Sequence, residues 1–102
     1  MLIKILDHSL GEFIESLEKS TIAKVLRVVD LLEQFGRDLQ MPHSRMVRKN
    51  LFELRIRGRQ EVRIFYTFQQ SKIILLHGFI KKSQKTSRKE IELALQKIAG
   101  LD

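Results

Sequence analysis

The sequence predicts an α+β fold, with two N-terminal helices packed on an antiparallel sheet of three to four strands and a C-terminal helix after it. The spacing of apolar residues carries this prediction: they recur every three to four positions before Gly36 and again after Thr86, but alternate with polar residues from Asn50 to Phe68. The chain has 102 residues, the usual length of one domain, so we expect residues 1–102 to form a single domain.

The N-terminal part predicts one short strand and two helices. Residues 2–6 are mostly apolar and suit a short strand. Ser9 and Glu12 have the spacing of a capping box, which predicts a helix start at Ser9. Ser20 is the expected N-cap of a second helix, and Gly36 stands where that helix should end. Residues 39–44 are expected to form a loop.

Three strands are expected in the C-terminal half. Residues 52–57 and 62–68 alternate between apolar and polar side chains, and Gly58-Arg59 is a turn signal between them. Residues 72–80 are apolar on both faces, as expected of a strand with neighbours on either side. A charged loop over 81–85 follows. Thr86 or Ser87 should then cap a last helix that stops before Gly100.

Positive charge is concentrated in the middle of the chain. The formal net charge is +7, and residues 45–89 hold thirteen basic and two acidic residues. So many like charges in one segment repel one another unless a partner compensates them. The pattern favours a surface that binds a polyanion over a merely solvated basic face.

Other function classes are less compatible with the composition. The chain has no cysteine, which excludes disulfides and thiolate metal sites. The three histidines lack the spacing of a helical zinc pair, so we expect neither a metal nor a cofactor. No segment has the length of a membrane span or the form of a signal peptide, and we expect a cytoplasmic protein without membrane contact.

The alternating strands predict a cluster of arginines. Arg55, Arg57 and Arg63 should lie on the sheet face opposite the apolar side chains, and cross-strand neighbours are about 5 Å apart. If the helices cover the apolar face, these arginines line an open surface. Such a cluster can bind phosphates, or it can stabilise the transition state of phosphodiester cleavage. A lysine with a lowered pKa can then accept a 2′-hydroxyl proton from RNA. The pattern by itself leaves both interpretations open.

Three segments resemble the RelE/HigB toxins of the RelE/ParE superfamily, specifically their phage-derived HigB-like branch. They are residues 51–57 (LFELRIR), 62–66 (VRIFY) and 77–86 (HGFIKKSQKT), and the helix that ends in LLEQFG before Arg37 is similar as well. The resemblance extends over about residues 12 to 98. It implies a RelE-like fold and a type II toxin that enters the ribosomal A site and cleaves mRNA without a metal. It also implies a cognate helix-turn-helix antitoxin, through which the toxin reaches operator DNA.

The resemblance also assigns roles to residues. Arg55 stands in the place of a catalytic lysine and Arg63 in that of a transition-state arginine, while Lys81 or Lys82 is our choice for the general base. Glu53 replaces a second basic residue of the relatives. Further RNA contacts, to message or ribosomal RNA, are expected from Arg57, Arg48, Lys49, Gln84, Lys85 and His77.

Two alternatives to the endoribonuclease remain open at this point. One is a ParE-like inhibitor of DNA gyrase that cleaves no nucleic acid. The other is an inactive nucleic-acid-binding module or autorepressor subunit, which predicts strongly salt-dependent binding without growth arrest. Separately, Arg48 and Lys49 can belong to a solvated loop, and His77 can be a structural, hydrogen-bonded group. Mapping RNA cleavage separates the nuclease from both.

Overall fold

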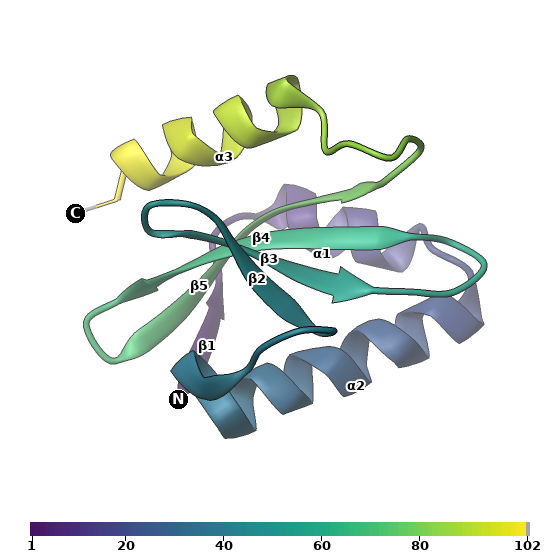
Figure 1. The fold of residues 1–102 in the computed structure, drawn as a ribbon. Coiled ribbons are helices and arrows are strands. Elements are labelled where there is room, and N and C mark those ends of the chain that lie inside the picture. The colour runs from purple at the N-terminus through teal and green to yellow at the C-terminus, as the bar shows by residue number, and fades with distance from the viewer. Residues whose placement is uncertain (102) are drawn as a thin grey trace.

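A mixed sheet of five strands, in the order β1-β5-β4-β3-β2, forms the centre of the computed structural model, which describes residues 1–101 (Figure 1). The helices are α1 (His8–Glu15), α2 (Lys19–Phe35) and α3 (Arg88–Ala99), and a short 3-10 turn spans Gly36–Asp38. The strands are β1 (Leu2–Ile5), β2 (Ser44–Arg48), β3 (Leu51–Ile56), β4 (Val62–Gln69) and β5 (Lys72–Ile80).

The predicted antiparallel sheet of three to four strands beneath two N-terminal helices is wrong. The chain begins with a strand, and β1 pairs with β5 in parallel, with Leu2 opposite Lys72. A further strand, β2, pairs with β3. Its residues lie at the end of the predicted loop over 39–44 and in the basic stretch that follows that loop. Local patterns did not reveal either pairing, because the partner of β1 begins only at Lys72 and β2 has mostly exposed side chains.

The helices lie on both faces of the sheet (Figure 1). Helices α1 and α2 pack on one face, where Leu10, Val25 and Leu32 join the inward side chains of β3, β4 and β5. Helix α3 covers part of the other face, where Ile91 and Ala94 pack against residues including Phe65. This second layer buries Phe65 completely, so it is unable to stack on a nucleotide base.

The helix ends follow the sequence signals only in part. Helix α2 ends at Gly36, which has the positive φ of +52° that favours glycine, and the Ser87 hydroxyl caps α3 by accepting from the Lys89 N–H. The caps predicted at Ser9 and Ser20 are not formed. Ser9 instead donates to Asp7, the residue before α1. The capping-box spacing therefore placed the start of the first helix one residue too late, and its N-cap two residues too late.

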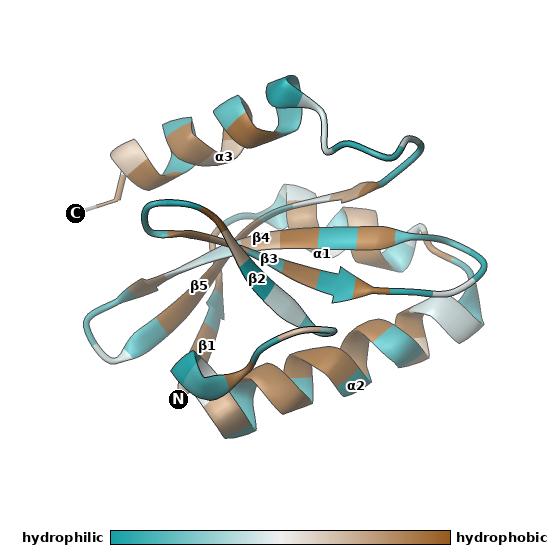
Figure 2. Ribbon diagram, viewed as in Figure 1, coloured by the Kyte–Doolittle hydropathy of each residue, from teal (hydrophilic) through white to brown (hydrophobic). Residues whose placement is uncertain are grey.

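Strands β3, β4 and β5 form an antiparallel meander that positions the polar residues. Arg55 pairs with Arg63 across β3 and β4, and Arg63 pairs with Phe79 on β5. The β3–β4 turn and the segment 81–87 leave the sheet at the same end, and both are largely hydrophilic (Figure 2). The Lys81 N–H donates to the Glu61 carbonyl at 2.7 Å, which joins this segment to the turn.

Candidate nucleic-acid interface

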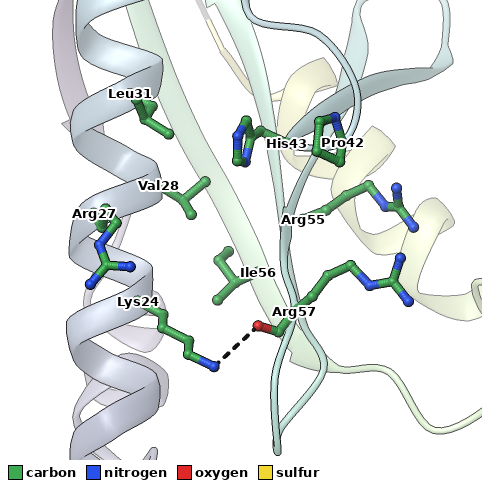
Figure 3. Close-up of a pocket in the computed structure, with 9 residues that line it drawn as sticks. All are labelled: Lys24, Arg27, Val28, Leu31, Pro42, His43, Arg55, Ile56 and Arg57. Carbon is green, nitrogen blue, oxygen red and sulfur yellow. Dashed lines mark hydrogen bonds between the residues drawn. The ribbon is translucent and has the colours of Figure 1, made fainter.

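Alternation along β3 separates an arginine face from an apolar face. The side chains of Arg55 and Arg57 point away from α2, while Ile56 between them points toward it (Figure 3). On the helix side, a hollow of about 250 Å³ is floored by Val28, Leu31 and Ile56. The Lys24 amine at its edge contacts the Arg57 carbonyl at 3.5 Å. The guanidinium groups of Arg55 and Arg57 therefore lie on the side of the sheet away from α2, facing the segment 81–87.

A polar hollow of about 500 Å³ opens on this arginine face. It lies where the β3–β4 turn meets the segment 81–87, so strand ends and a loop together supply its walls. We call it the basic cleft; it is lined by Arg55, Arg57, Glu61, Arg63, Lys81, Lys82, Ser83 and Gln84. Five of these eight side chains are cationic and one is a carboxylate, so the cleft suits a phosphate backbone.

A buried carboxylate lies behind the basic cleft. Glu53 is fully buried, and its Oε1 faces three guanidinium groups: Arg45 at 3.1 Å, Arg63 at 3.7 Å and Arg55 at 3.8 Å. Its Oε2 accepts a hydrogen bond from the Thr86 hydroxyl at 3.1 Å. A charge buried this deeply is tolerated only when it is paired, and Glu53 has partners from β2, β3, β4 and the segment before α3.

The arginine face is less open than the strand pattern predicts. The Arg57 side chain is 63% exposed, but that of Arg55 is 14% and that of Arg63 only 3% exposed. Arg63 is held by Glu53 and by Glu61, whose Oε1 accepts from Arg63 Nη2 at 3.2 Å. Arg63 therefore presents almost no surface to solvent. Direct contact between Arg63 and RNA requires the side chains around it to rearrange.

Burial, together with repulsion from neighbouring cations, lowers the pKa of two cations of the cleft. Burial, followed by the nearby Arg63, lowers the pKa of the Lys81 amine from its usual 10.5, and Glu53 opposes the change. Burial and Arg63 likewise lower the pKa of Arg55 from 12.5. Desolvation and like charge both disfavour the cationic form. A larger fraction of Lys81 is therefore neutral, and able to accept a proton near neutral pH, than of a solvated lysine.

Glu61 is held in its charged form at the rim of the cleft. Partial burial acts to raise the pKa of this carboxyl above 4.5, but hydrogen bonds from the Gly58 N–H and from Arg63 outweigh it and lower the pKa. The Arg57 guanidinium adds an ion pair at 3.5 Å. Glu61 thereby ties the β3–β4 turn to two of the arginines.

The structure brings most of the predicted site residues together around the segment 81–87. Arg55, Arg57, Arg63, Lys81, Lys82 and Gln84 line the basic cleft. Lys85 and Arg48 line an adjoining hollow of about 410 Å³ that also contains Gln84. Lys49 lies in the β2–β3 turn, outside these hollows, and about 20 Å along β3 from Arg57.

His77 faces a third hollow, on the other side of the segment 81–87. This hollow of about 480 Å³ shares Lys81, Lys82 and Ser83 with the basic cleft. The His77 ring stacks on Phe79, and its Nε2 lies 3.1 Å from the Glu90 carboxylate of α3. His77 therefore joins β5 to α3 beside the cleft, as its structural interpretation predicts.

Three residues of the site were missed by the sequence interpretation. Glu53 was recognised only as a departure from the resembling toxins, and Arg45 and Thr86 were given no part in the cleft. Glu53 did carry a signal, since it is an acidic residue on the same strand face as Arg55 and Arg57. Arg45 and Thr86 carried none, because only the pairing of β2 with β3 and the path of the loop bring them to Glu53.

Within residues 1–101, no group of three or more histidine, aspartate or glutamate side chains is placed to hold a metal ion. None of the described helices has both the length and the apolar character needed to cross a bilayer.

Comparison with known proteins identifies one family. The family model described as "Phage derived protein Gp49-like (DUF891)" matches residues 12–99, which is most of the chain. The match includes every residue of the basic cleft. No curated protein matches the chain.

Proposed function

The chain belongs to the Gp49-like family of phage-derived proteins, and on that premise we propose that it is a type II toxin of the RelE/HigB group that cleaves mRNA on the ribosome. The observation that carries the proposal is the meeting of Arg55, Arg63 and Lys81 at one end of the sheet. These three side chains come from β3, β4 and the segment after β5, and they correspond to the positions that the resemblance marks as catalytic.

The cleft chemistry supports cleavage by the RNA's own 2′-hydroxyl. A neutral Lys81 amine removes the 2′-hydroxyl proton, and the 2′-oxygen forms a bond to the adjacent phosphorus. The bond from phosphorus to the 5′-oxygen breaks, and the Lys82 ammonium gives its proton to that leaving oxygen. The products are a 2′,3′-cyclic phosphate and a 5′-hydroxyl. This acid–base route is internal to the RNA and uses no metal.

Each cation has a separate part in this scheme. The lowered pKa of Lys81 increases its neutral fraction near neutral pH. The Arg55 side chain is more exposed than that of its strand partner Arg63. Its guanidinium contacts the phosphate as negative charge builds up. Arg63 acts from behind as a fixed positive charge. Arg57, Gln84, Lys85, Arg48, Lys49 and His77 are the proposed contacts to the rest of the message and to ribosomal RNA.

The proposed partners follow from the same role. The substrate is mRNA in the ribosomal A site, in the cytoplasm. A cognate helix-turn-helix antitoxin neutralises the toxin and links it to operator DNA. Charge complementarity supports both partners, because thirteen basic and two acidic residues lie between Arg45 and Lys89.

One observation favours a second candidate, an RNA-binding module that does not cleave. Arg63 is nearly buried and is engaged by Glu53 and Glu61, so the cleft presents fewer free cations than an open arginine face. Such a module binds RNA through Arg57, Lys82 and Lys85 and leaves the message intact.

Expression of the wild-type chain in translating cells, with mapping of mRNA 5′ ends, tests the proposal. We expect growth arrest and new 5′ ends within coding regions that disappear when translation is blocked. Lys81→Met should abolish these ends. Lys4→Met is the matched control, because Lys4 is an exposed lysine on β1 and takes no part in the cleft.

Intact message in growth-arrested cells would contradict the nuclease assignment. Arrest with DNA damage then identifies a gyrase inhibitor of the ParE type. RNA binding without arrest or cleavage identifies the binding module. Cleavage by Lys81→Met at the wild-type rate would remove Lys81, but not the nuclease, from the proposal.

A further inference from the structure

We propose that Glu53 is a positioning residue that holds Arg55 and Arg63 side by side and, through Thr86, holds the segment 81–87 over them. This inference rests on the proposed function. Glu53 does not line the basic cleft, and its proposed task is to hold the residues that do. It gives a role to the one acidic residue that stands where the resembling toxins carry a basic one.

The geometry of the sheet creates the need for such a residue. Arg55 and Arg63 are direct partners across β3 and β4, and like charges directly opposite one another destabilise a strand pair. Both guanidinium groups have little access to water that would screen them. Their Nε atoms are buried and make no hydrogen bond, and each has the Glu53 carboxylate within 3.8 Å. Glu53 is thus the charge that allows the two arginines to remain together.

The same carboxylate connects the arginines to the segment that carries Lys81 and Lys82. Oε1 of Glu53 faces the guanidinium groups, whereas Oε2 accepts from Thr86 at 3.1 Å. Thr86 lies five residues after Lys81, next to the Ser87 cap of α3. Among the described residues, Thr86 supplies the side-chain hydrogen bond that joins the far end of this loop to β3, and Lys81 is joined at the near end to Glu61.

The positions of the residues in the sheet do not by themselves explain why three guanidinium groups remain together around position 53. The negative charge of Glu53 is needed as well. Arg45 on β2 is the direct partner of Glu53, Arg55 is two positions along the same strand, and Arg63 is diagonal to it on β4. A neutral side chain of equal size keeps the packing but removes the carboxylate that faces Arg45 and Arg55, and it leaves Arg63 with Glu61 alone. The carboxylate, and not merely a polar group, is therefore required at position 53.

Three variants separate the charge from the hydrogen bond. Glu53→Gln removes the charge and keeps the size of the side chain. Thr86→Val keeps the charge and removes the hydrogen bond to the loop. Glu18→Gln is the matched control, because Glu18 is exposed and pairs with the exposed Arg59, and neither residue lines the basic cleft.

The first measurement is the pKa of the Lys81 amine, which an NMR titration determines. This measurement does not depend on any RNA cleavage. Glu53 acts to raise this pKa, so Glu53→Gln should lower it by about 0.5 pH unit relative to the wild type. Glu18→Gln should leave it unchanged. Thr86→Val should also leave it unchanged, because it releases only the far end of the loop while the Lys81 N–H still donates to the Glu61 carbonyl. The charged and titratable groups around Lys81 in this titration come from every element near it: Arg45 on β2, Glu53 and Arg55 on β3, Arg57 and Glu61 in the β3–β4 turn, Arg63 on β4, His77 on β5, Lys82 and Lys85 in the loop, and Glu90 on α3.

The second measurement is the pH–rate profile of mRNA cleavage. We expect both Glu53→Gln and Thr86→Val to lower the plateau rate about 10- to 100-fold, because both release the loop from its position. Only Glu53→Gln should also move the rising limb of the profile to lower pH. A purely structural role would reduce the folded fraction and scale the whole profile without moving that limb.

An unchanged Lys81 pKa together with a wild-type plateau in Glu53→Gln would overturn the inference. If Glu53→Gln does not fold, Thr86→Val decides the positioning role, since a wild-type plateau there contradicts it. If the wild-type chain cleaves no RNA, the proposed function fails. In that case the Lys81 titration and the amide exchange of residues 82–87 in the two variants decide whether Glu53 organises the cleft.

Discussion

Glu53 and Glu61 are the two acidic residues between Arg45 and Lys89, and both contact Arg63. Their placement shows how a strongly basic segment becomes a stable surface. Each carboxylate faces more than one guanidinium group, so repulsion among the cations is reduced at the point where they are closest. The same contacts accompany the burial of Arg63, whereas Arg57 and Lys82 are exposed cations of the cleft.

At the residue scale, Lys81→Met should stabilise the protein while it abolishes cleavage. The lowered pKa of Lys81 means that the folded state disfavours its charged form, so the unfolded chain holds more protons just below pH 10.5. Wild-type stability therefore rises with pH through that window, and the variant loses this rise. Near pH 7 we expect the melting temperature of Lys81→Met to be about 2 °C higher. A lower melting temperature, measured by circular dichroism, would contradict the argument.

Glu61 should give the protein a measurable acid sensitivity. The pKa of this carboxyl is lowered in the folded state, so its contribution is complete above pH 4.5 and is lost as the pH falls through the lowered value. The melting temperature of the wild type should drop more steeply below pH 4.5 than that of Glu61→Gln. Parallel curves for the two proteins would show that the Gly58 and Arg63 contacts contribute nothing in solution.

At the scale of secondary structure elements, the contact between α1 and β5 depends on a glycine. A Cβ atom at Gly78 would lie 2.8 Å from the Phe13 ring and 2.9 Å from Leu10 Cδ1, so any side chain there pushes α1 away from the sheet. Gly78→Ala should lower the free energy of unfolding by about 1–3 kcal/mol in urea denaturation.

Gly11→Ala is the control for this substitution. A Cβ at Gly11 meets nothing within 4 Å, and alanine favours a helix more than glycine does. Gly11→Ala should raise the free energy of unfolding by about 0.5–1 kcal/mol. Equal stability of the two variants would mean that α1 is not seated on Gly78.

Elements with a long, regular pattern were predicted from the sequence, and short or distant ones were not. The stripe that ends at Gly36 and the cap at Ser87 correspond to the observed α2 and α3 boundaries. Strand β2 was missed because Arg45, Met46 and Arg48 are exposed at the sheet edge and give no alternation. The fold class was wrong because the parallel pairing of β1 with β5 makes the sheet mixed, and a local pattern does not show which strand β1 pairs with.

At the scale of the whole molecule, RNA binding should depend steeply on salt. If three to five cations around the segment 81–87 contact a single-stranded RNA, the slope of log K against log salt should be roughly −2 to −3.5. Lys82→Gln should reduce the magnitude of that slope by about 0.7. Lys4→Gln, which removes a remote charge, should leave it unchanged. Fluorescence anisotropy with a labelled oligonucleotide measures all three, and a slope near zero would exclude phosphate binding.

The distribution of charge and the alternation of strands were determined by the sequence alone. Residues 45–89 are basic wherever the chain folds them, and two antiparallel strands joined at Gly58 place Arg55 and Arg63 on one face. These properties depend on local periodicity and composition, which the sequence contains directly. The resemblance to RelE/HigB toxins draws on the same segments.

Only the tertiary structure decided how much of that face is open. Helix α3 covers its Phe65 end, Glu61 pairs with Arg63, and Glu53 receives partners from three strands and from Thr86. These contacts join residues that are far apart in the chain, and their distances depend on how the strands pair and where the loop 81–87 lies. Burial and charge compensation are properties of that packing, which is why composition alone predicted an open arginine face and the folded chain has a partly closed basic cleft.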